Sequence, residues 1–284
     1  MSWYDKYLDI YEIPYKDISD SKKQEVKKAL ETKRSVSQPL VSVVAIAHNE
    51  EKHILPCLWS LGDSKCDFPI EIIVVSNAST DMTNDILEYL DVQWYNEEKK
   101  SPGFARQCGL DHAKGKYYIC IDSDTIYPPD YIATHVHYLQ KKNVVCTYGL
   151  WSFIPSDKYP KFKLFFYELL RDFYLGLQNI KRPEACVRGM VLAFNTELAR
   201  KVGFRTNIIR GEDGMMAFGL KQYGKLLFLK KRRIKPVTST SILDGEKGIM
   251  GNLFLRMTKI LRDRTGLFTS ISDYKDREDN LIKK

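Results

Sequence analysis

The chain has 284 residues, of which 44% are hydrophobic and 28% charged, and its formal net charge is +8. These values fit a globular protein with one large domain, or one domain and a small appendage. No apolar run reaches the roughly 18 residues of a membrane-spanning helix, and the first residues lack the basic start and apolar core of a signal peptide. The six cysteines include no CxxC pair, so we expect buried free thiols and a cytoplasmic protein.

Positive charge is concentrated in residues 221–264, which contain twelve Lys or Arg and three acidic residues. Such a block indicates an anionic partner, namely a membrane surface, a nucleic acid or a phosphorylated substrate, or else an ordinary solvated surface. Aromatic residues that could stack on bases do not alternate with these charges. We therefore expect no nucleic-acid partner.

The predicted elements begin with a polar helix over 19–34, inside an N-terminal extension, 1–38, that Pro39 ends. Strands are predicted where short apolar runs occur, at 40–47, 70–76, 92–95, 116–122, 144–151, 187–195 and 225–237. Helices are predicted between and after them at 50–61, 80–90, 103–115, 129–141, 159–181, 196–203 (capped by Thr196) and 211–224. This alternation over residues 39–245 predicts an α/β fold with a mostly parallel central sheet and helices on both faces.

Polar clusters follow three of the predicted strands, where a parallel sheet binds its ligands. They are His48-Asn49-Glu50, Ser76-Asn77-Ala78-Ser79 and Asp122-Ser123-Asp124. Neither GxGxxG nor GxxxxGK[ST] is present, so the two commonest phosphate loops are absent. Two carboxylates as close as those of Asp122 and Asp124 repel each other unless a cation lies beside them.

Five segments occur in order and with compatible spacing, namely VSVVAIAHNEE, IEIIVVSNASTDMT, GFARQCGLDHAKGKYYICIDSDT, VRGMVLAFNTELARKVGF and RGEDGMMAFGLKQYG. Together they resemble the glycosyltransferase family 2 enzymes of GT-A fold over about residues 39–245. The resemblance implies a Rossmann-like nucleotide-binding half and an acceptor-binding half. It further implies an inverting, metal-dependent hexosyltransferase that moves a sugar from a nucleotide-diphosphate donor to a hydroxyl of a glycan or lipid-linked acceptor, in bacterial surface polysaccharide synthesis.

The resemblance also assigns donor-binding residues at the strand ends and on one helix. His48 stands where relatives commonly have Tyr, and Asn77 stands where they have Asp. The Asn77 oxygen can accept a hydrogen bond from the uracil N–H, but its amide can also donate, so a UDP-sugar is favoured and a GDP-sugar comes next. The assigned residues are Ala47, His48, Asn49, Glu50, Asn77, Ser79, Arg106, Asp122 and Ser123.

A divalent cation would neutralise the diphosphate as it leaves, and Mg²⁺ or Mn²⁺ prefers hard oxygen ligands. Asp124 is the expected direct metal ligand, and Asp122 is expected to bind the metal, metal-bound water or ribose. The residues alone allow another interpretation, in which both carboxylates are solvated or Asp122 caps the turn. No His lies within 225–284 to supply the further ligand that relatives often have.

The acidic pair Glu212 and Asp213 opens the predicted helix 211–224. By the family pattern Asp213 is the base that takes the acceptor proton. The alternative is that both carboxylates accept from backbone N–H groups at the helix start. This alternative accounts well for one acidic residue at that place and poorly for two.

Two further segments are apolar enough to need an interpretation. Residues 246–284 form a basic C-terminal segment in which 247–264 have amphipathic helical spacing. This segment either binds an anionic membrane surface, at the inner face of the cytoplasmic membrane, or packs back on the catalytic domain. The aromatic-rich segment 162–177 is interpreted as core, or as a wall of the acceptor site, rather than as a membrane anchor.

Two other functions compete with the transferase. A sugar nucleotidyltransferase needs a Gly-rich loop after the first strand, and AIAHNEE has no Gly. A non-catalytic carbohydrate-binding relative of the same fold would not need Asp124 and Asp213, which are both present.

Overall fold

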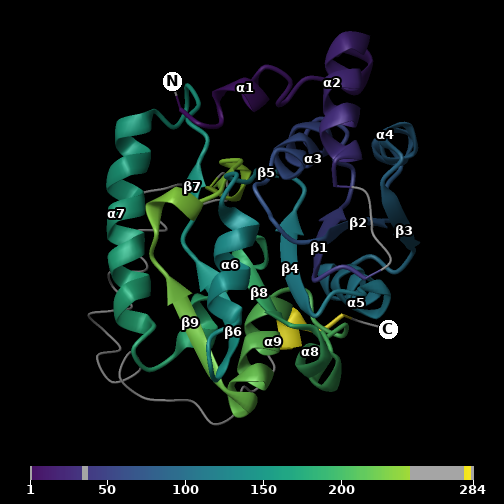
Figure 1. Ribbon diagram of the computed structural model, residues 1–284. Helices are drawn as coiled ribbons and strands as arrows, with labels where there is room; N and C mark the ends of the chain where they lie inside the picture. The colour runs from purple at the N-terminus through teal and green to yellow at the C-terminus, as the bar shows by residue number, and fades with distance from the viewer. Residues whose placement is uncertain (1, 34–37, 244–277, 283–284) are drawn as a thin grey trace.

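The computed structural model describes residues 2–33, 38–243 and 278–282. Its centre is a seven-stranded sheet with the order β3-β2-β1-β4-β8-β6-β9 (Figure 1). Strand β8 pairs antiparallel with both neighbours, and every other pair in this sheet is parallel. The predicted mostly parallel sheet is therefore confirmed. The strands are β1 (Val41–Ala47), β2 (Ile70–Asn77), β3 (Gln93–Glu97), β4 (Tyr117–Asp122), β6 (Val144–Gly149), β8 (Leu192–Asn195) and β9 (Lys225–Leu229).

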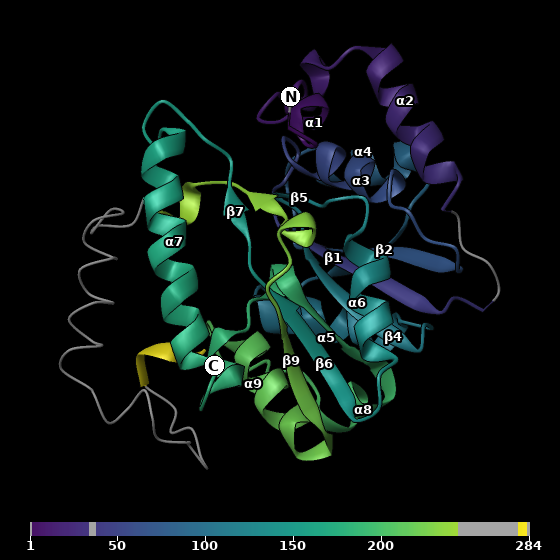
Figure 2. The ribbon, with the colours of Figure 1, turned by 60° about the vertical axis from the view of Figure 1, so that its left-hand side comes forward.

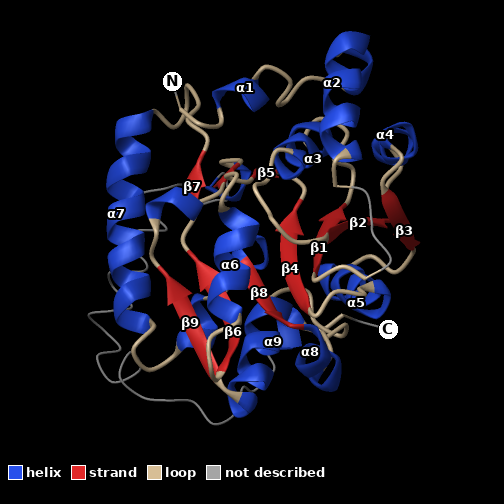
Figure 3. Ribbon diagram, viewed as in Figure 1, coloured by secondary structure: helices blue, strands red, loops and turns tan. Residues whose placement is uncertain are grey.

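Helices cover both faces of this sheet, as predicted (Figure 3). Alternate residues of β1 face opposite cores: Val43 and Ala45 contribute to one apolar cluster and Val44 to the other. The first cluster includes α2 (Asp20–Glu31), α3 (Ile54–Gly62), α4 (Thr83–Leu90) and α6 (Tyr131–Leu139). The second includes α5 (Pro102–His112), α7 (Lys161–Gln178), α8 (Thr196–Val202) and α9 (Glu212–Leu220).

A second, three-stranded sheet lies beside the end of β4. Its order is β5 (Thr125–Ile126), β10 (Val237–Thr238) and β7 (Ser152–Phe153). The predicted strand 225–237 is wrong in its middle, because β9 ends at Leu229 and β10 begins at Val237. The four consecutive cations between them, Lys230 to Arg233, are exposed. A strand points successive side chains to opposite faces and would place every second one against the core.

Two other boundaries differ from the prediction. The strand expected over 187–195 begins only at Leu192, after a 3₁₀ turn at Gly189–Val191. A Cβ at Gly189 would collide with the Arg106 guanidinium, so the turn brings the backbone against that side chain. Thr196 does not cap α8; the Asn195 side chain accepts from the Leu198 N–H at 3.1 Å, and the Thr196 hydroxyl donates to the Gly115 carbonyl at 2.6 Å.

The N-terminal extension packs over α3 and α4 (Figure 2). Besides α2 it contains α1 (Asp5–Leu8) and an irregular stretch whose large apolar and aromatic side chains are buried in the first core. The sequence showed no periodicity there. The buried side chains are Tyr7, Ile10, Tyr11, Tyr15 and Ile18.

The predicted amphipathic segment 247–264 lies outside the described residues. Of the C-terminal part, residues 278–282 are described, and Leu281 forms an antiparallel bridge with Ile208. Within the described residues, no helix is both long enough and apolar enough to cross a membrane.

The interpretation of 162–177 as core is only half right. Helix α7 buries Leu164, Tyr167 and Leu175 on one side, but its opposite side leaves large apolar residues exposed. Those within α7 are Phe162, Phe165, Phe166, Leu169, Leu170 and Phe173.

Helix α5 approaches the sheet closely through Gly109, and a replacement there should be destabilising. A Cβ at Gly109 would lie 2.5 Å from Val44 Cγ1 and 2.8 Å from Tyr118 Oη. We expect Gly109→Ala to lower the free energy of unfolding by about 1–2 kcal/mol in a denaturant titration, because overpacking outweighs the gain in helix propensity.

The matched control is Gly176→Ala in α7, where the added Cβ would meet only the end of the flexible Lys230 side chain, at 3.3 Å. This variant should be as stable as the wild type or more stable by up to about 1 kcal/mol. Equal stability of both variants would show that α5 is not held tightly against the sheet.

Candidate active site

The three strand-end clusters meet around one cavity of about 480 Å³. They come together because β1, β2 and β4 are parallel neighbours and end at the same edge of the sheet. Most of the predicted site residues line the cavity, and Glu212 and the residues of the loop before α5 line it too. The lining residues are Ile46, Ala47, His48, Glu50, Asn77, Lys100, Ser101, Pro102, Ala105, Arg106, Asp122, Ser123, Asp124, Glu212 and Asp213.

Asp122 and Asp124 reach the cavity from a turn. Strand β4 ends at Asp122, and the chain turns through residues 123 and 124 before β5. In a continuing strand, residues 122 and 124 would point to the same side because side chains alternate. Here the turn, and not this alternation, brings the two carboxylates together. The backbone of the turn is fixed from other elements, since Tyr127 Oη accepts from the Asp122 N–H at 3.0 Å and Tyr11 Oη donates to the Asp124 carbonyl at 2.7 Å.

Arg106 is the cation beside the paired carboxylates, and it is almost fully buried. Its Nη2 donates to Asp122 Oδ1 at 2.5 Å, and its Nη1 donates to the Ile121 carbonyl at 3.1 Å. Its Nε lies 3.4 Å from Asp213 Oδ1. Much of the guanidinium is thus engaged with protein groups. Arg106 holds the end of β4 and the start of α9 together, and its predicted contact with the donor stays a prediction.

Asp124 lies in an environment with surplus negative charge. Burial raises the pKa of its carboxyl to about 6, and the neighbouring charges of Asp122 and Glu50 add to the effect. Its Oδ1 accepts from the Thr125 hydroxyl at 3.0 Å. A carboxylate in such surroundings is stabilised by an added cation.

These oxygens fit a Mg²⁺ or Mn²⁺ ion that is completed by substrate phosphates. Within residues 2–33, 38–243 and 278–282, no three His, Cys, Asp or Glu side chains form a group that could hold a metal by themselves. Sites for these ions often use only one or two carboxylates plus phosphate oxygens. Thr238, Ser239 and Ser241 add hydroxyl oxygens beside the two aspartates, where all five residues line a second cavity of about 260 Å³.

Asp213 and Glu212 both face the first cavity from the start of α9. Burial raises the pKa of Asp213, and Asp122 adds to the rise while Arg106 opposes it. Burial and the charge of Asp213 also raise the pKa of Glu212. Raised pKa values make both carboxylates stronger bases than an exposed Asp or Glu. The N-cap residue of α9 is Gly211, which has no side chain to cap the helix. The Glu212 carboxylate accepts from its own backbone N–H, so the helix-start interpretation applies to Glu212. The Asp213 carboxylate instead accepts from the backbone N–H of Gly189, outside the helix.

The orientation of the Asn77 amide is fixed by its surroundings. Its Nδ2 donates to the carbonyls of Glu97 and Lys99, both at 2.9 Å. The amide N–H groups are therefore already bonded, and the oxygen is left to accept from a ligand. The exposed His48, at the cavity rim, contacts the Asn77 carbonyl through Nδ1 at 2.6 Å, which requires a proton on that nitrogen.

Asn49 and Ser79 do not line the cavity. The Ser79 hydroxyl accepts from the Asn49 N–H at 3.1 Å, and Asn49 Oδ1 accepts from the Thr80 N–H at 2.7 Å. These bonds join the loops after β1 and β2, so both residues act on the shape of the site. Their predicted contact with the donor remains untested.

Glu50 is supported by His53, and His53 in turn contacts two residues of the N-terminal extension, Glu12 and Tyr11. This contact with the extension was not predicted. His53 Nδ1 lies 2.7 Å from Glu50 Oε2, and His53 Nε2 lies 3.1 Å from Glu12 Oε1. The Tyr11 ring packs on the same imidazole, with 4.9 Å between ring centres. The spacing of Glu50 and His53 allows an i,i+3 pair, but nothing in the sequence reveals the second partner, Glu12.

This bridge makes stability depend on pH. Burial lowers the pKa of His53, but hydrogen bonds and charges of Glu50 and Glu12 outweigh it and raise the pKa from 6.5 to about 9. The folded state therefore binds more protons between these values. The stabilisation is complete below pH 6.5 and is lost as the pH rises through about 9.

We expect His53→Gln to lower the free energy of unfolding at pH 6 by about 1–3 kcal/mol, with the difference shrinking above pH 9. Denaturant titrations at several pH values measure this. The control is His137→Gln, since His137 is exposed and no described carboxylate bonds to it. A constant difference between His53→Gln and the wild type across the pH range would contradict the charged bridge.

Comparisons with known proteins agree on one family. The sequence profile described as "Glycosyl transferase family 2" matches residues 42–203. An uncharacterized glycosyltransferase, YfnE of Bacillus subtilis, is 33% identical over 130 residues, which are 43% of this chain and 33% of YfnE. The UDP-Glc:alpha-D-GlcNAc-diphosphoundecaprenol beta-1,3-glucosyltransferase WfaP of Escherichia coli is 31% identical over 114 residues, 39% of this chain and 45% of WfaP. The match thus spans less than half the length of each relative.

Solved structures show the same fold at low sequence identity. The mannosyltransferase PcManGT of Pyrobaculum calidifontis, in complex with GDP-Man and Mn²⁺, has a TM-score of 0.55 and 19% identity, over 85% of this chain and 71% of its own. Glucosyl-3-phosphoglycerate synthase of Mycobacterium tuberculosis, in complex with Mn²⁺, UDP-Glc and phosphoglyceric acid, has a TM-score of 0.53 and 18% identity, over 88% and 85%. Because the family profile covers more than half of the chain, the protein belongs to glycosyltransferase family 2, and its fold is the GT-A fold.

Proposed function

We propose that the enzyme transfers a sugar, with inversion, from a nucleotide-diphosphate donor to a hydroxyl of a glycan or lipid-linked acceptor. The observation that carries the proposal is the meeting of Asp122, Asp124 and Asp213 around one cavity at the strand ends. This arrangement supplies carboxylate oxygens for a cation and a separate carboxylate for a proton. The name of WfaP, which describes a sugar-diphosphoundecaprenol acceptor, supports a lipid-linked acceptor in polysaccharide synthesis.

The donor is held at the end of the sheet where β1, β2 and β4 stop. The free oxygen of Asn77 suits the N–H of a uracil, so a UDP-sugar is proposed first and a GDP-sugar second. Asp124 and Asp122 would hold Mn²⁺ or Mg²⁺. When bound, that ion would act as a Lewis acid and stabilise the negative charge of the departing diphosphate. Both solved structures named above contain Mn²⁺ and a nucleotide sugar, one with GDP and one with UDP.

Asp213 is proposed as the general base of a single displacement. The acceptor oxygen forms a bond to the anomeric carbon while the bond from that carbon to the diphosphate oxygen breaks, which inverts the centre. The acceptor proton passes to the Asp213 carboxylate. Arg106 lies beside this carboxylate as an ion-pair partner, with 3.4 Å between Nε and Oδ1 but no hydrogen bond between these two atoms.

A thermal-shift series tests the donor and metal assignments together. With Mn²⁺, UDP at about 100 times its dissociation constant should stabilise the wild type by about 2.7 kcal/mol, and GDP at the same concentration should do so less. Asp124→Asn should lose the Mn²⁺-dependent part of this stabilisation and all transfer activity.

The matched control is Asp67→Asn, which changes an exposed Asp outside the cavity and should behave as the wild type. Stabilisation by GDP alone would reverse the order of donors. Normal turnover of Asp124→Asn would remove this residue from the metal site.

The base assignment is tested by comparing Asp213→Asn with Glu212→Gln. Asp213→Asn should keep donor affinity in the thermal-shift assay but lose roughly 10²–10⁴-fold in kcat, since general base catalysis is worth about that much. Glu212→Gln should retain most of kcat. If Glu212→Gln loses the rate and Asp213→Asn keeps it, the base is Glu212.

A further inference from the structure

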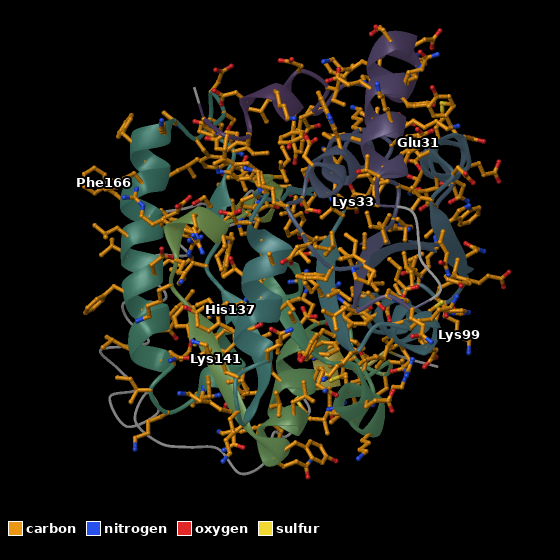
Figure 4. All side chains as sticks on the ribbon, in the orientation of Figure 1. Glu31, Lys33, Lys99, His137, Lys141 and Phe166 are labelled. Carbon is orange, nitrogen blue, oxygen red and sulfur yellow. The ribbon has the colours of Figure 1, made fainter. Side chains whose placement is uncertain are left out.

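The outer side of α7 is an exposed apolar surface, which we call the α7 face. It consists of seven side chains that are between 42% and 65% exposed. In Figure 4 the labelled Phe166 projects away from the body of the protein, and in Figures 1 and 2 α7 forms the edge of the described fold. The seven residues are Phe162, Phe165, Phe166, Leu169, Leu170, Phe173 and Ile180.

The α7 face is held rigidly from behind. Arg171 is buried on the inner side, where its Nη2 donates to the Trp151 carbonyl at 2.5 Å and its guanidinium lies over the Trp151 ring at 4.3 Å. Glu168 accepts from the Ser152 hydroxyl at 2.8 Å and from the Phe153 N–H at 2.9 Å. The exposed Phe side chains therefore belong to a well-packed helix, and an exposed apolar patch on such an element marks a contact with a partner.

Charges around the face are of one sign. Both acids of α7 bond to groups on the inner side of the helix. Glu168 accepts the two hydrogen bonds given above, and Asp172 forms ion pairs with Arg171 at 2.8 Å and with Lys235 at 2.9 Å. Lys161 and Lys163 at the start of α7 and Lys181 after its end are exposed. Along the described sequence on either side of α7, the nearest exposed acid is Asp157, which lies before the helix. The face is thus apolar in its middle and basic at both ends.

This pattern is complementary to an anionic lipid surface. Phe and Leu on one side with Lys at the margins are typical of helices that lie in the plane of a membrane interface, and each nearby basic residue strengthens binding to anionic lipids. A protein-binding face is also enriched in Phe, but it is depleted of Lys. The exposed Lys161, Lys163 and Lys181 at the two ends of α7 therefore favour an anionic lipid surface.

We propose that the α7 face binds the surface of an anionic bilayer, with the helix axis parallel to the membrane. Glu168 ties α7 to β7, and β7 pairs with β10. Thr238 of β10 and the following Ser239 line the second cavity together with Asp122 and Asp124. The three-stranded sheet therefore connects α7 to the cavity that the two aspartates line. The membrane proposal rests on the proposed function, in which the acceptor is linked to a lipid. An enzyme bound to the bilayer surface would lie next to such an acceptor.

Vesicle sedimentation of the full chain tests the proposal. The wild type should pellet with vesicles that contain phosphatidylglycerol, pellet less with neutral phosphatidylcholine vesicles, and be released by added salt. Replacing Phe162, Phe166 and Phe173 together by Ser should weaken binding to the anionic vesicles at least about tenfold, because three exposed aromatic anchors are lost. Replacing Lys161, Lys163 and Lys181 by Gln should weaken it mainly at low salt.

The matched control replaces Ile13 and Tyr223 by Ser, since both are exposed apolar residues outside the α7 face. This variant should bind vesicles as the wild type does. The Phe variant should keep its melting temperature and its stabilisation by UDP and Mn²⁺. A failure of the nucleotide assay with intact vesicle binding would count against the proposed function only.

Three outcomes would overturn the membrane proposal. Unchanged sedimentation of the Phe variant, with loss of binding on replacing Arg256, Lys259 and Arg262 by Gln, would assign the membrane contact to 247–264. A wild-type dimer that becomes a monomer in the Phe variant by analytical ultracentrifugation, without vesicle binding, would assign the face to a second copy. A lowered melting temperature of the Phe variant without vesicle binding would show that the chain itself covers the face.

Discussion

The buried guanidinium of Arg106 is the interaction on which the site depends. A cation at this depth is stable only with carboxylate partners, and Asp122 and Asp213 come from segments about ninety positions apart in the sequence. The surrounding packing serves this contact. Gly109 lets α5 approach the sheet, and Gly189 leaves room for the guanidinium. Removing Arg106 would leave two carboxylates unpaired, and the end of β4 and the start of α9 would repel each other.

Arg106 does not neutralise the cavity. Five carboxylates line it, from Glu50, Asp122, Asp124, Glu212 and Asp213, against the cations Arg106 and Lys100. The raised pKa values of Asp124, Glu212 and Asp213 are consequences of this surplus and of burial. An anionic diphosphate alone would be repelled by such a cavity. Under the proposed function, a divalent cation makes the cavity attractive to the diphosphate, while the more deeply placed Asp213 remains available to a proton.

The sheet and the position of the site were predictable because they depend on local patterns. Buried parallel strands are continuous apolar runs, and their ends carry the polar clusters, so the order of elements sufficed to bring His48, Asn77 and Asp124 to one edge. The pairing of Arg106 with two carboxylates could not be read in this way, because it joins three distant segments. Residues 162–177 were interpreted as core or as a wall of the acceptor site because the segment is apolar on most sides, and only the packing shows which side is covered.

The support of Asp124 shows how the N-terminal extension contributes to the site. Tyr11 donates to the Asp124 carbonyl, and the Thr125 hydroxyl bonds to that of Thr238 at 2.9 Å, so the backbone of the turn is fixed from two sides. Neither Tyr11 nor Thr238 bonds to the Asp124 carboxylate itself. Tyr11 also packs on His53, which bonds to Glu50, another carboxylate that lines the cavity. The extension therefore helps to hold two segments whose carboxylates repel each other, which is the preorganisation that a cation-binding cavity requires.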